Sequence, residues 1–237
     1  MEKLSVIIPV LNEVGNLGEL SRRIMNYTED SEIIFVDDGS EDGTRSLIQN
    51  IASSNTQIKY IFNEKRLGHM GSYLEGVSKA KSDNIVIMDG DLQHPPEILP
   101  DFLFAFERGF NLVIGTRYVN YSFIGKRSVV RGLISRTADL ILKLTVPECR
   151  SISDPVSGFI GFKRKLNIPV TPEMKGNKLL PFLLVSNWNL KIAYAPYRFH
   201  ERVSGKSKIV SGGTSFIWKF LREVLDIRAV SKKKYNR

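Results

Sequence analysis

The feature that most constrains this fold is a regular alternation of short apolar segments with longer helix-like segments through the first half of the chain. The apolar segments are rich in Val and Ile and cover residues 4–11, 32–36, 58–62, 84–88 and 110–115. The first of them, residues 4–11, is a nearly continuous apolar run, which is typical of a strand covered on both faces. The intervening segments predict helices that end near residues 27, 53, 81 and 108. The alternation therefore predicts an α/β fold with a mostly parallel sheet flanked by helices in a single domain.

The second half is less regular, and its elements are predicted from periodicity. A helix is expected over about 128–144, where apolar residues recur at helical spacing. Residues 157–162 look extended, and residues 191–197 form a further candidate strand. The last helix, expected over about 214–227, is amphipathic. Its polar face carries Lys219, Arg222, Glu223 and Asp226.

Acidic and amide side chains follow three of the predicted strands. In open parallel sheets, ligands bind beyond the carboxyl ends of the strands. The residues at that edge are Asn12, Glu13, Asp37, Asp38, Asp89 and Asp91. Because they share one edge of the sheet, they predict a single site.

The tripeptide Asp89-Gly90-Asp91 is the strongest candidate for a metal site. Gly90 permits a turn that lets both carboxylates face one cation. Oxygen ligands suit Mg²⁺ or Mn²⁺, which would neutralise a diphosphate leaving group. The alternative is a solvated turn that caps a helix, because Asp and Gly are common turn residues. Gln93, His94 and two prolines behind the tripeptide make the metal interpretation more specific.

Other polar residues admit a structural interpretation as well as a functional one. Asp37 and Asp38 could cap the next helix. A second acidic pair at the same edge favours contact between Asp38 and the base or ribose of a nucleotide. His69 and His94 invite a general-base role, but neither has an obvious carboxylate partner in the sequence. A phosphate acceptor, which is already ionised near neutral pH, would need no base.

Basic residues of the second half suggest a phosphate site. Arg127, Arg131 and Ser135 share one helix face at spacings of four, and such a face is usually solvated. Arg117 lies just beyond a strand at the active edge, and guanidinium groups grip phosphate at two points, which favours binding. The Gly/Ser-rich stretch 202–208 is either a basic loop or one that closes over a diphosphate.

Charge divides sharply between the two halves. Residues 1–116 hold 10 Lys and Arg against 18 Asp and Glu, whereas residues 117–237 hold 24 against 7. A basic half suits phosphates on nucleic acid, on anionic lipids or on a phosphorylated substrate. The sequence pI of about 9.6 raises a nucleic-acid-binding domain as an alternative. No nucleic-acid-binding motif supports that alternative, and the acidic cluster would repel phosphate without a metal.

Six motifs together resemble those of family 2 glycosyltransferases, and more narrowly the dolichyl-phosphate mannose synthase branch with its bacterial polyprenyl-phosphate relatives. The resemblance extends over about residues 4–225. It is carried, in order, by Pro9, Asn12-Glu13, VDDGS at 36–40, DGDLQHPPE at 89–97, SDPVSGF at 153–159 and RVSGKSK at 202–208. It implies a GT-A fold, Mg²⁺ or Mn²⁺, and inverting transfer from a GDP- or UDP-sugar to a polyprenyl phosphate.

GDP-mannose and dolichyl or polyprenyl phosphate are the favoured substrates under this resemblance. UDP-glucose or UDP-GlcNAc as donor, and a soluble saccharide as acceptor, remain alternatives. A saccharide acceptor would need a carboxylate base nearby, and Arg117, Arg131 and Ser135 would then have no role in binding it.

By position, the resemblance also assigns roles to individual residues. The nucleoside pocket would contain Pro9, Leu11, Glu13, Val36 and Asp38, and Asn12, Asp37 and Gly90 would complete the donor site. Metal and diphosphate would be held by Asp89, Asp91 and Gln93. The acceptor phosphate would be bound by Arg117, Arg131 and Ser135. The donor diphosphate would be met from the opposite side by Lys178, Arg202 and Lys208. Asp89, Asp91, Arg117 and Arg131 would carry the catalysis.

Location and domain organisation are predicted from the same sequence. We expect a GT-A catalytic domain over residues 1–210, followed in 211–237 by an amphipathic helix with a basic tail. Because no secretory signal and no apolar run of about 18 residues is evident, a cytoplasmic protein is expected. The final helix and the lysines after it predict peripheral contact with a membrane or a membrane-protein partner. The alternative is that this helix packs on its own sheet.

Overall fold

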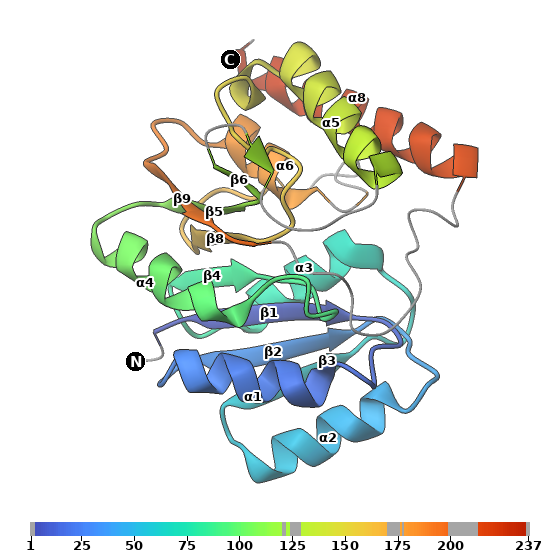
Figure 1. The fold of residues 1–237 in the computed structure, drawn as a ribbon, viewed down its shortest axis with the longest axis vertical. Coiled ribbons are helices and arrows are strands. Elements are labelled where there is room, and N and C mark those ends of the chain that lie inside the picture. Colours follow the sequence, from blue (N-terminus) through green and yellow to red (C-terminus); the bar gives the residue numbers. More distant parts are fainter. Residues whose placement is uncertain are drawn as a thin grey trace.

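Seven of the strands form one sheet in the computed structural model (Figure 1). The structure describes residues 3–119, 122–123, 129–169, 176, 178–198 and 213–235. Within these ranges, side chains are not described for 119, 122–123, 129–131, 213–216 and 234–235. The sheet order is β3-β2-β1-β4-β8-β5-β9. Its strands are β1 Ser5–Val10, β2 Glu32–Asp37, β3 Ile58–Phe62, β4 Asn84–Ile87, β5 Leu112–Thr116, β8 Ile160–Lys163 and β9 Ile192–Pro196.

Helices cover both faces of this sheet, as the βα alternation predicts. They are α1 Leu17–Tyr27, α2 Thr44–Ser54, α3 Gly68–Lys79, α4 Leu99–Glu107, α5 Val129–Thr145, α6 Leu179–Ser186 and α8 Gly213–Tyr235. Short 3₁₀ turns, η1 Pro96–Ile98 and η2 Pro147–Cys149, precede α4 and follow α5. One apolar core joins the sheet to α1, α2 and α4, and a second joins it to α3, α5, α6 and α8. The predicted single-domain α/β architecture is confirmed.

The central strands show why the early apolar runs fold this way. All six residues of β1 and all six of β2 are buried. Ile7 packs in the core with α3, whereas Val6 and Ile8 pack in the core with α1. Because successive side chains point to opposite faces, a strand buried on both faces must be apolar at nearly every position.

The second half departs from the prediction in three ways. Strand β8 runs antiparallel between β4 and β5, so the sheet is mixed at its centre. Helix α6, which the sequence analysis did not predict, is buried over Leu179–Val185. A small hairpin pairs β6 Tyr118–Val119 with β7 Ser122–Phe123.

Helix α8 extends to Tyr235, well beyond the predicted end near residue 227. Val224 and Ile227 of α8 are buried in the core shared with α6. The expected domain boundary at residue 210 lies outside the described residues, so the division into two parts stays a prediction. None of the described helices combines the length and the apolar character needed to cross a bilayer.

Candidate active site

The loop that follows β4 carries the predicted metal-binding residues to the carboxyl edge of the sheet. The backbone N–H of Met88 donates to Ile7 O at 3.1 Å, which continues the pairing with β1 to the start of the loop. Gly90 lies against the end of β1, where a Cβ would come within 3.2 Å of Val10 Cγ1. The Asp89 side chain is 39% exposed. Asp91 is only 3% exposed. The loop therefore offers one accessible and one sheltered carboxylate.

Two local features fix the shape of this loop. The backbone N–H of Gln93 donates to Asp91 Oδ1 at 3.1 Å. Between them, the buried Leu92 has φ +63°, in the left-handed region that residues with a Cβ seldom adopt. Such a conformation costs free energy, so the surrounding packing must hold it. Strained residues of this kind cluster at functional sites, which agrees with a binding role for the loop.

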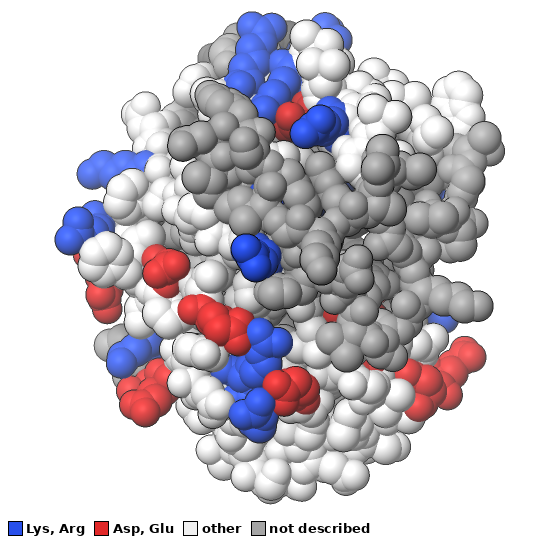
Figure 2. Space-filling view, viewed as in Figure 1, with Lys and Arg blue, Asp and Glu red and all other residues white. Residues whose placement is uncertain are grey.

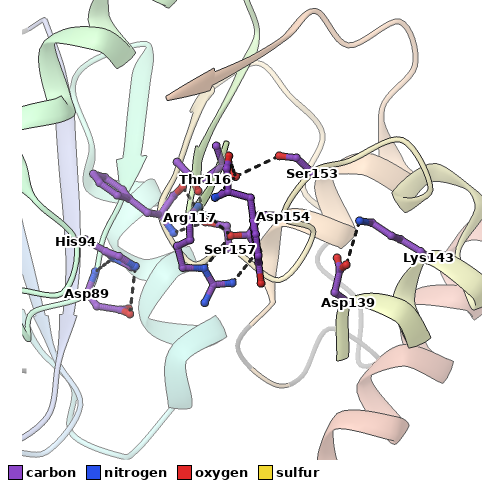
Figure 3. Close-up of polar contacts among 12 residues, drawn as sticks. Asp89, His94, Thr116, Arg117, Asp139, Lys143, Ser153, Asp154 and Ser157 are labelled. Carbon is purple, nitrogen blue, oxygen red and sulfur yellow. Dashed lines mark hydrogen bonds and ion pairs between the residues drawn. The ribbon is translucent and has the colours of Figure 1, made fainter. Parts of the chain in front are cut away.

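His94 closes the same loop and contacts Asp89 at two points (Figure 3). The backbone N–H of Asp89 donates to His94 Nδ1 at 2.9 Å, and His94 Nε2 lies 3.8 Å from Asp89 Oδ2. The ring stacks on Phe159 at 4.9 Å between centroids. Burial lowers the pKa of His94, although the charges of Asp89 and Asp91 oppose that shift. The carboxylate partner that the sequence did not reveal for His94 is therefore Asp89.

The ligand set fits a cation that takes part of its coordination from its substrate. Among the described residues, no three side chains of His, Cys, Asp or Glu come together as a metal site. Mg²⁺ is commonly held by one or two carboxylates together with substrate phosphates and water. Asp89 and Asp91, with the amide of Gln93 beside them, match that pattern.

Asp37 and Asp38 both receive hydrogen bonds from the protein. Asp37 accepts the backbone N–H groups of Gly39 and Ser40, and Arg45 Nε donates to Asp37 Oδ1 at 2.5 Å. These donors outweigh burial and lower the pKa of Asp37. Asp38 Oδ1 and Oδ2 accept the backbone N–H groups at the start of α3, from residues 67 and 68. Both aspartates thus hold turns at the site edge, and their contact with a nucleotide stays a prediction.

The remaining nucleoside-pocket candidates lie on β1, on β2 and in the loop after β1. Pro9 and Val36 are register partners on these adjacent strands. Asn12 has φ +58°. Its Oδ1 accepts the N–H of residue 41 at 2.8 Å. The backbone N–H of Glu13 donates to a threonine hydroxyl at the start of α2. Leu11 is half-buried beside them. The fold therefore brings these predicted residues to one edge of the sheet.

Arg117 follows β5 and forms a buried ion pair with Asp154 (Figure 3). Arg117 Nε donates to Asp154 Oδ2 at 2.8 Å, and a second guanidinium nitrogen donates to Asp154 Oδ1 at 2.7 Å. Burial alone would lower the pKa of Arg117, but the charge and hydrogen bonds of Asp154 raise it. This two-point pair holds the guanidinium in a fixed orientation just beyond the end of β5.

The other two residues predicted to bind the acceptor phosphate, Arg131 and Ser135, belong to α5. Ser135 Oγ is buried and has no hydrogen-bond partner in the described part of the chain. One turn later on α5, Asp139 accepts from Lys143 at 3.0 Å (Figure 3). Arg131 belongs to α5, but its side chain lies outside the described residues. Ser135 therefore provides an unsatisfied hydroxyl on the predicted acceptor side.

Lys178 precedes α6 and is the only diphosphate-side candidate whose position is described. Arg202 and Lys208 lie outside the described residues. Burial lowers the pKa of Lys178, while the nearby carboxylates of Glu223 and Asp89 oppose the shift. Its backbone N–H donates to Glu223 Oε1 at 2.8 Å. Lys178 thus lies within electrostatic range of the Asp89 carboxylate.

Asp154 and Glu223 received no functional role from the sequence, and His94 was considered as a general base without a carboxylate partner. Asp154 lies inside the motif SDPVSGF at 153–159, and membership of that motif was the only indication in the sequence that it belongs to the site. His94 stands directly behind the metal tripeptide, but its partner becomes visible only when the loop closes. Glu223 was placed on the polar face of the last helix, yet it is 6% exposed. No signal in the sequence separates Glu223 from its exposed neighbours.

Acidic side chains are unevenly distributed on the face shown in Figure 2, where they lie together with Lys and Arg in the lower and middle part. In Figure 2, the visible acidic side chains gather over the lower and middle part of the molecule, where Figure 1 shows α1, α2 and α3. The top, near the C-terminal helices, shows mainly Lys and Arg.

Comparison with protein families finds one match. The family described as "Glycosyl transferase family 2" matches this chain over residues 5–170. That range includes the acidic strand ends, the Asp89 loop, Arg117 and Asp154.

Three of the curated relatives have the same name. A dolichol-phosphate mannosyltransferase of Pyrococcus furiosus is 37% identical over 224 residues, which cover 94% of this chain and 62% of the relative. A dolichol-phosphate mannosyltransferase of Saccharomyces cerevisiae is 32% identical over 220 residues, covering 86% of this chain and 80% of the relative. The chain thus spans less than two thirds of the Pyrococcus protein.

Solved structures agree on the fold. Glucosyl-3-phosphoglycerate synthase from Mycobacterium tuberculosis, in complex with Mn²⁺, UDP and glucosyl-3-phosphoglycerate, superposes with a TM-score of 0.71. The alignment has 20% identity and covers 97% of this chain and 80% of the synthase. The same enzyme in complex with Mg²⁺ and UDP also gives a TM-score of 0.71, at 20% identity over 95% of this chain and 79% of that chain. These similarities establish the GT-A fold.

Proposed function

Because the chain belongs to glycosyl transferase family 2, we propose that it transfers a sugar, with inversion, from a nucleotide donor to dolichyl or polyprenyl phosphate. Mannose is the favoured sugar and GDP-mannose the favoured donor, since the curated relatives in Pyrococcus and Saccharomyces are named dolichol-phosphate mannosyltransferases. The donor would occupy the acidic half of the site, and the lipid phosphate would occupy the basic half.

The observation that carries this proposal is the contact between the two halves of the site. Asp154, the partner of Arg117, lies in a turn whose Ser157 N–H donates back to Asp154 O at 3.1 Å. A Cβ at the next residue, Gly158, would lie 3.9 Å from Asp89 Oδ2. One turn therefore touches the metal-loop carboxylate and also holds the arginine proposed to bind the acceptor phosphate.

On the donor side, Asp89, Asp91 and Gln93 would hold Mg²⁺ or Mn²⁺. Bound there, the ion offsets the negative charge that collects on the departing nucleotide. His94 keeps Asp89 oriented through its two contacts. Lys178 would meet the donor diphosphate from the other side. Oriented carboxylates and a fixed cationic side chain favour the transition state because they need no rearrangement during the reaction.

On the acceptor side, the phosphate would be bound rather than deprotonated. The ion pair with Asp154 fixes the orientation of the Arg117 guanidinium, so this cationic group is already in place when the acceptor arrives. Ser135 would donate its unpaired hydroxyl to a phosphate oxygen. The phosphate oxygen is a nucleophile in its ionised form, so attack on the anomeric carbon requires no general base.

A transfer assay tests this function directly. GDP-mannose, UDP-glucose and UDP-GlcNAc are each offered with a polyprenyl phosphate or with a soluble saccharide, with Mn²⁺ or with EDTA. We expect mannose transfer to the lipid phosphate that requires Mn²⁺ or Mg²⁺. Transfer that persists in EDTA would contradict the metal role, and preference for the saccharide would contradict the acceptor.

Peripheral contact with a membrane is the second part of the proposal. On α8, Ile217, Trp218 and Leu225 are 58%, 71% and 65% exposed. On α5, which packs against α8, Leu133 and Leu144 are 67% and 68% exposed. Adjacent helices with exposed apolar side chains and nearby lysines suit the interface of an anionic bilayer.

Flotation of the full chain with anionic vesicles checks this contact. The Trp218→Ser/Leu225→Ser double variant is expected to lower the partition coefficient onto vesicles by at least about 100-fold, since burial of each side chain stabilises binding by about 1.5–3 kcal/mol. Phe104→Ser is the matched control, because Phe104 is 55% exposed on α4, which covers the opposite face of the sheet. Equal flotation of all three proteins would refute the assignment of this surface.

A further inference from the structure

Glu223 is a buried carboxylate on a helix whose other acidic and basic side chains largely face outward. It is 6% exposed, whereas Arg222 beside it is exposed. A charged side chain is rarely buried unless it is paired. Its partner is the segment before α6: the backbone N–H of Lys178 donates to Glu223 Oε1 at 2.8 Å. The bond joins positions that are 45 residues apart.

The same segment is packed closely against the Glu223 carboxylate at a second point. Gly176 has φ +99°, a conformation that favours glycine. A Cβ at this position would lie 2.3 Å from Glu223 Cδ and 2.4 Å from its Oε1. Since no side-chain carbon fits in that space, Gly176 allows the backbone to approach the carboxylate closely. Two residues of this segment thus contact Glu223 independently.

We propose that Glu223 is a positioning residue for Lys178, and that it acts by anchoring the Lys178 backbone. The proposal rests on the function proposed above, in which Lys178 meets the donor diphosphate. A lysine has a long flexible side chain, so its ammonium is placed accurately only if the backbone that carries it is fixed. Glu223 supplies that fixation from α8. The C-terminal helix is therefore part of the donor site.

One helix then carries two functions. Ile217, Trp218 and Leu225 of α8 are the exposed side chains proposed to meet lipid, and Glu223 of the same helix holds the lysine of the donor site. Val224 and Ile227 fix α8 to the core beside α6, the helix that begins directly after Lys178. Removal of α8 should consequently damage donor binding as well as any membrane contact.

The test measures binding of GDP with Mn²⁺ to the full chain in the absence of lipid. Glu223→Ala is expected to weaken GDP binding about tenfold, which is the usual effect of losing a hydrogen bond to a charged group. Glu223→Gln keeps a side-chain oxygen that can accept the Lys178 N–H, because the side chain has the same length, and it should retain most of the affinity for GDP. Glu223→Asp keeps the charge but is one methylene shorter, so it should bind GDP more weakly than Glu223→Gln. Asp226→Ala, an acidic residue on the same helix, is the control and should bind as the unaltered chain does.

The order of the Gln and Asp variants decides the question even if Glu223→Ala fails to fold. If Asp binds GDP as well as Gln or better, Glu223 acts through its charge and the anchoring role is refuted. If all variants bind GDP like the unaltered chain, Glu223 has no role in the donor site. If the unaltered chain binds neither GDP nor UDP with Mn²⁺, the proposed function itself fails, and this inference fails with it.

Discussion

Replacement of Asp91 by asparagine is expected to lower kcat/KM for sugar transfer by roughly 10²–10³-fold, the usual cost of losing one group that stabilises transition-state charge. Asp91 is 3% exposed and one of only two carboxylates in the loop after β4. The change removes one of the two carboxylates that we propose as ligands of the cation. Asparagine keeps an oxygen that can accept the Gln93 N–H, so the turn itself should survive.

The measurement pairs kinetics with metal binding. Transfer is followed with saturating polyprenyl phosphate, and Mn²⁺ affinity is followed by electron paramagnetic resonance with GDP present. Both should fall together in Asp91→Asn, while thermal melting stays close to that of the unaltered chain. Asp101→Asn, which alters an exposed carboxylate in the first turn of α4, should change neither quantity. An Asp91→Asn protein with more than about a tenth of the original activity would rule out this metal assignment.

Replacement of Asp154 by asparagine is expected to lower the free energy of unfolding by about 3–5 kcal/mol. Arg117 is 15% exposed and has Asp154, which is fully buried, as its partner in two short hydrogen bonds. Without the carboxylate, a buried guanidinium is left without its counter-charge. The cost arises mainly from that uncompensated charge, because an intact buried pair adds little net stability.

Urea unfolding gives the stability change, and a matched acidic residue provides the control. Asp139 pairs with Lys143 at 3.0 Å, but both side chains are 24% exposed. Asp139→Asn should therefore change stability by no more than about 1 kcal/mol. Arg117→Met/Asp154→Leu, which removes both charges, should cost less than Asp154→Asn alone. If Asp154→Asn and Asp139→Asn unfold at the same urea concentration, Asp154 does not hold Arg117 as described.

The sequence determined the first half of the fold and the position of the acidic site. The apolar runs there are short, and each is followed by a polar turn. Those that form β1, β2 and β5 are buried on both faces, whereas β3 at the edge of the sheet is partly exposed. Local pattern and global fold therefore agree. The sequence-predicted strand over 58–62 coincides with β3, and the acidic residues lie at the carboxyl edge of the sheet. Parallel strands must end at the same edge, which is why strand order was not needed to gather Asp37, Asp38, Asp89 and Asp91.

Helix α6 shows where pattern fails. Its sequence, LLPFLLVS, is apolar on every side, and Leu179–Val185 are all buried. A helix buried all round has no polar face, so no 3.6-residue period can reveal it. The antiparallel entry of β8 between β4 and β5 is equally invisible, because strand direction depends on the path of the chain between strands.

What only the tertiary structure decided is how the charged residues of the site pair. Arg117 forms its ion pair with Asp154 across 37 residues, and the backbone N–H of Lys178 donates to the Glu223 carboxylate across 45 residues. In the sequence, each of these looks like an ordinary surface charge, because a local pattern carries no information about a partner so far along the chain. Burial makes these contacts specific: a charge removed from water needs a counter-charge or a hydrogen-bond donor, and only the folded chain brings the two groups together.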